Sequence, residues 1–318
     1  MRIFGMGRPG MEMGEKKIRM LIAGYPGIGK TTLALSAPKP LLIDVDKGVL
    51  RVNARHRTDT ADVQTYDELL KDMRPENLTE YETLVIDTGG QLLDLMKPWA
   101  IRQNAKNGQK NGRLTMQGYG VVGAEFARFV NDCFYKLNKN VVVIFHAKEE
   151  KDDDSTRLRI LVEGSTKDNI WQPMDLGGFM EMEGQNRVIG FTNCERYFAK
   201  GTHGIHGKYT IPELGEDTPN DFLTRLFEKV QQNIQEDAQR YEAERRAYEA
   251  VMERLVPQIE AMTAQTILDV QAAIRDAEHC LTSGKEAKHR FKEKLKELRM
   301  HWDKEAGAYV SDDSEPAQ

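Results

Sequence analysis

The chain has 318 residues, of which 40% are hydrophobic, and this is enough for one substantial core with a second element beside it. Its formal net charge of −5 excludes a global positive field, so any contact with DNA must come from local basic segments. No apolar run is long enough to cross a bilayer, and we predict a soluble protein without membrane contact.

The N-terminal segment, residues 1–17, contains glycine and charge but no continuous apolar stretch. We interpret it as a flexible leader and not as a secretory signal. Cys133, Cys194 and Cys280 are widely separated and lack metal-ligand spacing, which is typical of a protein in a reducing cytoplasm. Each cysteine is interpreted as an ordinary packed or surface residue.

Residues 24–31 fit the phosphate-binding loop pattern G-x-x-x-x-G-K-[ST] at every fixed position. The pattern follows a predicted buried strand, 18–23, and precedes a predicted helix start, 31–35, which is the order the motif requires. Glycines permit the backbone angles that let successive N–H groups surround a polyphosphate. We predict an ATP site in which Lys30 reaches the β- and γ-phosphates and the Thr31 hydroxyl binds Mg²⁺. The predicted cofactor-binding residues are Gly24, Tyr25, Pro26, Gly27, Ile28, Gly29, Lys30, Thr31 and Thr32. A glycine-rich turn that fits by accident is the alternative.

Two further predicted strands end in carboxylates. The first, 41–46, ends at Asp46, which we expect to face the nucleotide and to orient or deprotonate the attacking water. The alternative is an aspartate that only caps the following turn. The second strand, 81–88, has the form of a Walker B strand, in which Asp87 holds Mg²⁺ through water and Thr88 lies near the γ-phosphate. Between them, residues 65–73 predict a short helix capped by Thr65.

A polar, glycine-rich stretch, 102–119, separates predicted helices at 91–101 and 120–137. Its composition favours a slack surface loop, and the alternative is a mobile loop that contacts DNA phosphates through Lys106, Lys110 and Arg113.

The most hydrophobic predicted strand, 140–146, ends at His146. We predict that this side chain senses the γ-phosphate through a hydrogen bond, and the alternative is a surface histidine at a strand end. A charged turn at 149–154 and an alternating strand at 157–162 follow. Basic side chains there either contact DNA or a neighbouring subunit's nucleotide, or are ordinary exposed charges: Arg157, Arg159 and Lys167.

Residues 176–192 predict a β-hairpin around Glu183–Asn186 that extends the sheet antiparallel. His203 and His206 lie in a glycine-rich loop without acidic or cysteine partners nearby, so we expect them to face solvent and not to bind zinc.

From residue 221 to residue 310 the pattern predicts helices, the first bent or broken at Pro257, then 266–281 and 285–300. Residues 311–318 form an acidic tail that we predict to be disordered. Packing and oligomerisation are the favoured roles of the helical region. Its last helix is strongly basic and is an accessory DNA surface in the alternative interpretation, through Lys285, Lys288, Arg290, Lys292, Lys294, Lys296 and Arg299.

Residues 18 to about 215 resemble the phage-type P-loop ATPases built on a reduced RecA core, a family associated with single-strand annealing and homologous recombination. The resemblance rests on the phosphate loop, the strands 42–46 and 84–88, the strand tip 145–148, and Asp175-Leu176-Gly177-Gly178 before the hairpin. It implies an α/β fold: a RecA-like P-loop core over 18–220 with a mainly parallel sheet and an antiparallel hairpin extension, followed by a C-terminal α-helical region.

The resemblance also implies site residues and a function. The implied catalytic residues are Asp46, Lys30 and His146, the implied Mg²⁺ residues are Thr31 and Asp87, and the cofactors are ATP and Mg²⁺. RecA-like enzymes usually have Glu where this chain has Asp46, so slow hydrolysis is expected. The loops 102–118 and 149–170 occupy the positions that face DNA in RecA filaments.

The implied protein binds single-stranded DNA, hydrolyses ATP, forms a homo-oligomeric ring or filament, and works with recombination or replication proteins in the cytoplasm of a bacterial host. A nucleotide-dependent interaction or assembly factor without DNA binding is the alternative, which the helical region and the acidic net charge favour. A nucleotide kinase is disfavoured because no arginine-rich lid accompanies the phosphate loop.

Overall fold

A computed structural model of the chain describes residues 15–152, 155–162 and 170–312. These residues form two compact units that divide between Asn233 and Ile234. The first unit contains the phosphate-binding loop, and each unit is described by itself below.

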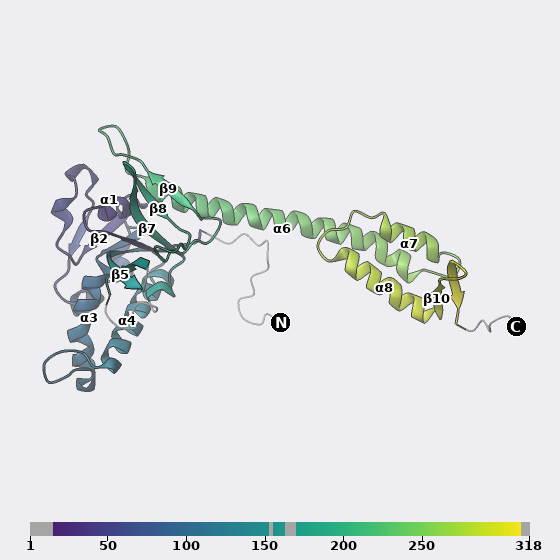
Figure 1. The fold of residues 1–318 in the computed structure, drawn as a ribbon, viewed down its shortest axis with the longest axis horizontal. Coiled ribbons are helices and arrows are strands. Elements are labelled where there is room, and N and C mark those ends of the chain that lie inside the picture. The colour runs from purple at the N-terminus through teal and green to yellow at the C-terminus, as the bar shows by residue number, and fades with distance from the viewer. Residues whose placement is uncertain (1–14, 153–154, 163–169, 313–318) are drawn as a thin grey trace. The chain divides into compact units, whose positions relative to one another are not determined.

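The first unit is built on a sheet with the strand order β3-β2-β4-β5-β1-β7-β8-β9. Pairing is parallel from β3 to β7 and antiparallel from β7 to β9, and β6 adds an antiparallel partner to β5. This confirms the predicted α/β fold with a mainly parallel sheet and an antiparallel hairpin extension (Figure 1). The strands are β1 (Arg19–Gly24), β2 (Pro40–Asp44), β3 (Thr60–Asp62), β4 (Thr83–Asp87), β5 (Asn140–Asp152), β6 (Ser155–Ile160), β7 (Leu176–Glu183), β8 (Asn186–Gly190) and β9 (Lys208–Ile211).

Helices cover the sheet because its central strands are apolar on both faces. β4 is buried at every position, and one face of the sheet packs against aromatic side chains of α4 such as Phe126 and Phe129. A capping box between Thr65 and Glu68 begins α2, as the sequence predicts. The helices are α1 (Lys30–Ala34), α2 (Tyr66–Asp72), α3 (Gly89–Gln103), α4 (Met116–Tyr135) and α6 (Phe222–Glu260), with 3₁₀ turns η1 (Val49–Arg51), η2 (Ala54–His56), η3 (Pro75–Leu78) and η4 (Ala105–Asn107).

The loop predicted at 102–119 is shorter and more ordered than expected, with the connection confined to the residues between η4 and α4. α3 continues to Gln103, η4 follows, and α4 begins at Met116, where the Thr115 side chain accepts a hydrogen bond from the Gly118 N–H. Asn107 is 3% exposed and its amide nitrogen donates to the Ala100 carbonyl at 2.8 Å. Side-chain bonds to the main chain, together with the buried side chain of Leu114, therefore order a segment whose composition is mostly polar.

Strand β5 does not end at His146, as predicted, but continues to Asp152. Its parallel pairing with β1 ends where Gly24 lies opposite His146, and from Ala147 onward it pairs with β6. Most of the predicted charged turn, 149–154, is therefore strand. Residues 153–154 lie outside the described residues.

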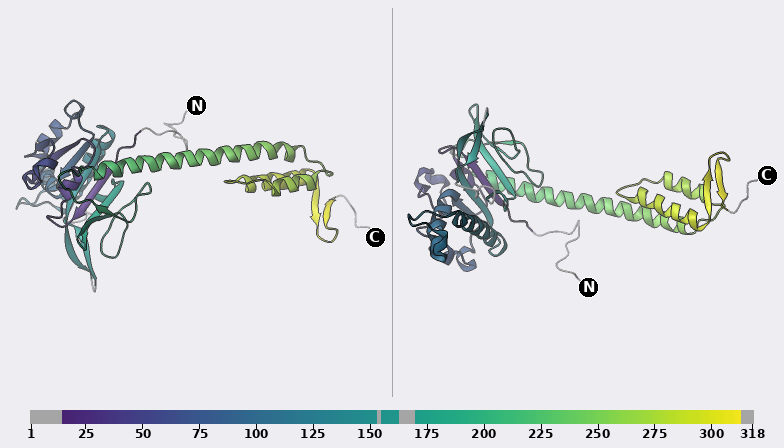
Figure 2. Two further views of the ribbon diagram at one scale, coloured as in Figure 1. Left: turned by 90° about the horizontal axis from the view of Figure 1, so that it is seen from above. Right: turned by 60° about the horizontal axis from the view of Figure 1, so that its bottom comes forward.

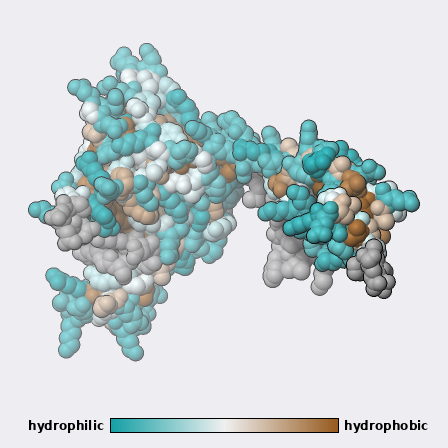
Figure 3. Space-filling model, turned by 45° about the vertical axis from the view of Figure 1, so that its right-hand side comes forward, coloured by the Kyte–Doolittle hydropathy of each residue, from teal (hydrophilic) through white to brown (hydrophobic). Residues whose placement is uncertain are grey.

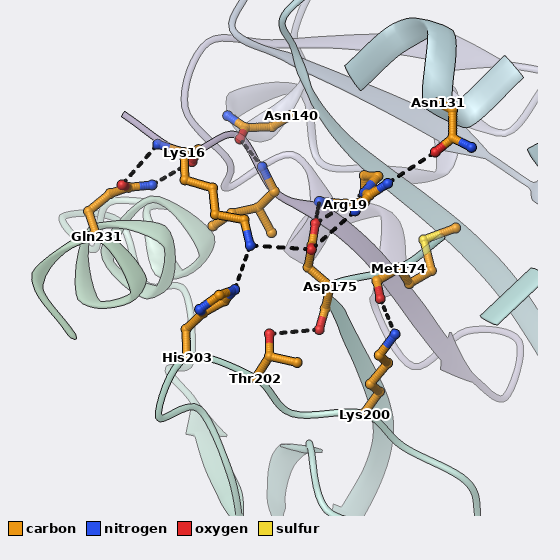
Figure 4. Close-up of polar contacts among 11 residues, drawn as sticks. Lys16, Arg19, Asn131, Asn140, Met174, Asp175, Lys200, Thr202, His203 and Gln231 are labelled. Atoms are coloured by element: carbon orange, nitrogen blue, oxygen red, sulfur yellow. Dashed lines mark hydrogen bonds and ion pairs between the residues drawn. The ribbon is translucent and has the colours of Figure 1, made fainter. Parts of the chain in front are cut away.

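The end of the predicted leader is held in place. The Lys16 main-chain N–H donates to Gln231 Oε1 at 3.0 Å, and its ammonium lies 2.6 Å from His203 Nε2 and 3.4 Å from Asp175 (Figure 4). His203 is consequently partly buried and does not face solvent freely, contrary to expectation. Residues 1–14 lie outside the described residues.

The second unit contains the end of α6, helices α7 (Ile267–Arg275) and α8 (Ser283–Glu297), and an antiparallel pair, β10 (Met300–Asp303) and β11 (Ala308–Ser311) (Figures 1 and 2). The predicted C-terminal helical region is confirmed, although helix α6 continues through Pro257 without a break and the last residues form a hairpin. Ser283 begins α8, where a helix stop was predicted. The predicted tail begins inside β11, and residues 313–318 lie outside the described residues. The hydrophobic core of the second unit comprises Leu255, Ile259, Met262, Ile267, Val270, Ile274, Ala287 and Phe291.

Among the described residues, no helix is both long and apolar enough to span a membrane. The face drawn in Figure 3 is mainly hydrophilic, with smaller apolar patches among the hydrophilic residues.

Candidate nucleotide-binding site

The phosphate-binding loop connects β1 to α1. Gly27 and Gly29 have φ angles of +80° and +97°, which side chains rarely tolerate, and a Cβ on Gly27 would meet no atom within 4 Å. Backbone conformation therefore requires glycine at these two positions. Gly24 differs, because its added Cβ would lie 2.9 Å from the Met180 carbonyl oxygen of β7. The close approach of two strands explains that glycine.

Lys30 begins α1 and points back into the loop. Its side-chain nitrogen donates to the carbonyls of Gly24 at 3.0 Å and Tyr25 at 2.8 Å, and lies 3.2 Å from His146 Nδ1. Burial lowers the pKa of Lys30 to about 8, against the opposing effect of Asp87 and Asp46. The Lys30 ammonium thus lies buried inside the loop, where a negatively charged phosphate would stabilise its positive charge.

Thr31 and Asp87 meet across the space between the loop and β4. The Thr31 hydroxyl donates to Asp87 Oδ2 at 2.6 Å, and Asp87 is 6% exposed. Burial raises the pKa of Asp87, and the hydrogen bond from Thr31 opposes that shift. A hydroxyl and a carboxylate are the oxygen ligands that Mg²⁺ prefers, and a divalent cation would favour the charged carboxylate.

These residues fit Mg²⁺ held together with nucleotide phosphates, because Mg²⁺ in such sites keeps several waters and uses few protein ligands. Within residues 15–152, 155–162 and 170–312, no group of three or more His, Cys, Asp or Glu side chains could hold a metal by itself. The metal site would therefore depend on the phosphates for its remaining ligands.

His146 lies beside this pair from the neighbouring strand β5. Its pKa is lowered by burial and further by the charge of Lys30, so the imidazole is neutral at neutral pH. Because the Lys30 ammonium can only donate, Nδ1 is the acceptor in their contact and Nε2 carries the proton. The Nε2–H is the group that could donate to a phosphate oxygen.

Asp46 follows β2, and a main-chain hydrogen bond holds it next to Asp87. Its N–H donates to the Asp87 carbonyl at 2.9 Å, and its carboxylate accepts from Arg51 at 2.8 Å. Its negative charge raises the pKa of Lys30 and of Asp87, as expected for a close neighbour. The turn-capping role considered for Asp46 belongs to Asp44. The Asp44 carboxylate accepts hydrogen bonds from the N–H groups of Gly48 at 2.9 Å and Val49 at 3.0 Å.

A pocket beside the loop includes a cation that sequence reasoning missed. A Cβ on Gly29 would lie 3.6 Å from the Arg187 guanidinium of β8. Arg187 was assigned only to a hairpin strand, because no local signal links β8 to the loop. Because β7 pairs with both β1 and β8, the sheet brings Arg187 of β8 close to the loop that follows β1. The pocket is lined by Gly29, Thr32, Leu33, Met180, Arg187, Ile211, Pro212, Leu214, Pro219, Asn220, Asp221 and Phe222.

The start of α6 is bonded directly to the end of the phosphate-loop helix, which the sequence did not indicate. Ser36, 1% exposed, accepts the Leu223 N–H on its hydroxyl at 2.9 Å, and its carbonyl accepts the Thr224 N–H at 3.0 Å. The Asn220 amide also donates to the Thr32 carbonyl at 2.9 Å. Ser36 thereby satisfies main-chain donors at the N-terminus of α6.

The basic residues predicted to contact DNA have varied surroundings. Lys106, Lys110 and Arg113 are exposed near η4, whereas Arg159 pairs with Glu150 at 3.2 Å. Lys167 lies outside the described residues.

Comparison with known proteins places this site in a family. The family model described as an AAA domain matches residues 16–203, more than half of the chain. No curated protein sequence matches. Among solved structures, the RadB recombinase is 12% identical with a TM-score of 0.36, over 64% of this chain and 88% of that one. An ATPase from the type III secretion system of pathogenic bacteria is 14% identical with a TM-score of 0.33, over 52% of this chain and about half (51%) of that one.

The match to the family model includes the loop, the two strands that lead to Asp46 and Asp87, and His146. The chain belongs to the AAA domain family of P-loop nucleoside triphosphatases.

Proposed function

We propose that the chain is a Mg²⁺-dependent ATPase of DNA recombination or single-strand annealing, which binds single-stranded DNA and assembles into a ring or filament. A phage-encoded protein of this kind would act in the cytoplasm of its bacterial host, together with recombination or replication proteins. The observation that supports the ATPase is the convergence of Lys30, Thr31, Asp87 and His146, with the Asp46 main chain bonded to Asp87, at one edge of a parallel sheet.

Each residue has a role in the proposed reaction. Lys30 exchanges its carbonyl partners for the β- and γ-phosphates, and His146 donates a hydrogen bond from its Nε2–H to the γ-phosphate. Asp46 orients the attacking water or accepts its proton. Mg²⁺ held by Thr31 and, through water, by Asp87 would neutralise charge on the phosphates. Because Asp46 is shorter than glutamate and is engaged by Arg51, slow turnover is expected.

The pocket beside Gly29 lies next to the phosphate-binding loop, but in this structure it is too narrow to hold a nucleoside. It adjoins Thr32 at the end of the loop and combines apolar side chains such as Leu33 and Phe222 with Arg187. Arg187, which lies beside Gly29, would contact a phosphate bound in the loop.

ATP turnover with and without single-stranded DNA tests the proposal. We expect Mg²⁺-dependent phosphate release that DNA increases, and its loss in Lys30→Ala. Lys39→Ala is the matched control, since Lys39 is exposed and pairs with Glu82 outside the site. Turnover that persists in Lys30→Ala, or ATP and DNA binding that never influence each other, would contradict the proposal.

A nucleotide-dependent assembly factor is the second candidate, and the bonds between Ser36 and the start of α6 favour it. They link the nucleotide-binding helix to a helix of 39 residues that could carry a partner. Such a protein would retain a partner protein only with ATP and show no affinity for DNA. Partner binding that is the same in wild type and Lys30→Ala would exclude it.

A further inference from the structure

Helix α8 in the second unit carries a basic surface that the ATPase site does not use. Its acidic residues are all engaged by bases of the same helix: Glu286 by Arg290 at 2.9 Å, Glu297 by Lys294 at 3.1 Å, and Glu293 by Lys296 at 2.8 Å. These pairs are three or four residues apart and neutralise one another. The basic character expected from the sequence is therefore smaller than a count of residues suggests.

Three lysines of α8 remain outside these pairs. Lys285, Lys288 and Lys292 are exposed, and among the described residues none of them forms an ion pair. Their spacing of three and four residues places them in one stripe along the helix, about 10 Å long at 1.5 Å per residue. Three uncompensated positive charges in a line are complementary to a chain of phosphates.

An exposed aromatic side chain is anchored to the same helix. Trp302 of β10 is 47% exposed, and its ring lies edge-on to Tyr309 with 5.0 Å between centroids. Tyr309 in turn contacts Phe291, on the buried face of α8, at 6.3 Å between ring centroids. This chain of aromatic contacts fixes Trp302 while leaving part of its ring open to solvent.

We propose that Lys285, Lys288, Lys292 and Trp302 form a binding surface for single-stranded DNA, with the lysines on phosphates and the Trp302 ring stacked on a base. The inference rests on the proposed function and locates its DNA contacts in the second unit. Basic stripes combined with an open aromatic ring are the usual means of binding single strands without sequence preference.

An anionic membrane is the less favoured partner. Helices that lie in a membrane interface insert a free apolar face. The apolar face of α8 is occupied, because Ala287 and Phe291 are buried in the core of the second unit. A stacked base, unlike a lipid headgroup, also makes use of the open Trp302 ring.

Fluorescence anisotropy with a labelled oligothymidine, measured on the full chain between 50 and 200 mM salt, tests the surface. For single strands, log K falls with log[salt] by about 0.7 per phosphate contact, so replacing three lysines should reduce the slope by about 2. Over this fourfold salt range the wild type should lose about 20-fold more affinity than Lys285→Gln/Lys288→Gln/Lys292→Gln. The matched control is Lys294→Gln/Lys296→Gln on the same helix, whose lysines are already paired and should affect the slope less.

Trp302 is tested separately. Trp302→Ala should weaken oligothymidine binding about fivefold or more at constant salt, whereas Trp302→Phe retains a ring for stacking and most of the affinity. Circular dichroism of each variant and ATP turnover without DNA should match the wild type, since these residues lie outside the nucleotide site.

The outcomes separate this inference from the proposed function. If the wild type binds oligothymidine and the triple variant has the same affinity and slope, the surface is wrong and the ATPase proposal stands. If the triple variant loses binding to phosphatidylserine vesicles but still binds DNA as the wild type does, the DNA surface is overturned in favour of a membrane-binding surface. If the wild type fails to bind DNA at any salt, both this surface and the DNA part of the proposed function fail. Measurement of ATP turnover then decides whether the chain is an ATPase.

Discussion

The Thr31 hydroxyl donates a 2.6 Å hydrogen bond to Asp87 Oδ2, joining the phosphate-binding loop to a strand that lies 56 residues later in the sequence. The bond holds the half-buried Thr31 hydroxyl beside the buried Asp87 carboxylate, and no three His, Cys, Asp or Glu side chains gather there to hold a metal by themselves. This conclusion applies to the residues that the structure describes. Such a pair can bind Mg²⁺ strongly only when phosphates supply further ligands, so metal and nucleotide binding should be coupled.

Asp87→Asn should raise the Mg²⁺ concentration for half-maximal ATP turnover about 10–100-fold, the usual effect of losing a residue that holds a metal ligand in place. A Mg²⁺ titration of turnover measures it. The same change should stabilise the ligand-free protein near neutral pH. Burial raises the pKa of Asp87 in the folded state, so its contribution to stability is present below the unfolded pKa and is lost as pH rises through the folded pKa. Urea unfolding at two pH values checks this, and an unchanged Mg²⁺ requirement would contradict the assignment.

The lowered pKa of Lys30, about 8, predicts proton uptake on ATP binding. Between pH 8 and 9 a large fraction of Lys30 is neutral in the ligand-free protein, and phosphate contact should restore its charge. Affinity for ATP should therefore fall as pH rises through this range. Calorimetry in two buffers of different ionisation enthalpy measures the protons taken up.

Lys30→Arg provides the control for that experiment, because arginine stays charged throughout the range. Its ATP affinity should be weaker but nearly independent of pH. Proton uptake equal to that of wild type in this variant would assign the titration to another group.

Asp46→Asn should lower ATP turnover about 10²-fold or more while ATP affinity changes little, if Asp46 acts on the attacking water. Arg51→Gln is the matched variant, since it removes the 2.8 Å contact to Asp46 and leaves the carboxylate in place. Single-turnover hydrolysis and equilibrium ATP binding separate the two effects. Turnover of Asp46→Asn within twofold of wild type would remove the residue from the mechanism.

His146→Ala should reduce discrimination between ATP and ADP, because the Nε2–H donor proposed for the γ-phosphate is lost. Turnover should fall about 10²-fold, as when one donor to a developing charge is removed. Binding constants for both nucleotides measure the ratio. His203→Ala is a control outside the site, since His203 contacts Lys16. Equal ATP preference in wild type and His146→Ala would contradict a sensor.

Ser36→Ala should lower the free energy of unfolding by about 1–3 kcal/mol, because it leaves the buried Leu223 N–H without its acceptor. Thr224→Val, which removes only a hydrogen bond to the Ser36 carbonyl, should cost less. Urea unfolding monitored by circular dichroism compares them. If both variants are as stable as wild type, the bond between α1 and α6 makes no net contribution.

Local features were predictable where the deciding interactions lie within a few residues. The spacing of glycines and Lys30 indicated the loop, and Thr65 with Glu68 indicated the start of α2. Segments without such signals were misjudged. The stretch around Asn107 is ordered by hydrogen bonds to Ala100 and Thr115, and composition does not reveal such bonds.

The sequence by itself determined a phosphate-binding loop, strands ending near Asp46 and Asp87, and a change to helical composition after residue 221, because motif chemistry and hydrophobic period are local properties. Only the tertiary structure decided that β5 lies between β1 and β4, that Arg187 lies beside Gly29, and that α6 is bonded to α1. The physical reason is that strand order and helix docking depend on main-chain hydrogen bonds and packing between segments far apart in the chain. No local pattern specifies which distant partner satisfies them.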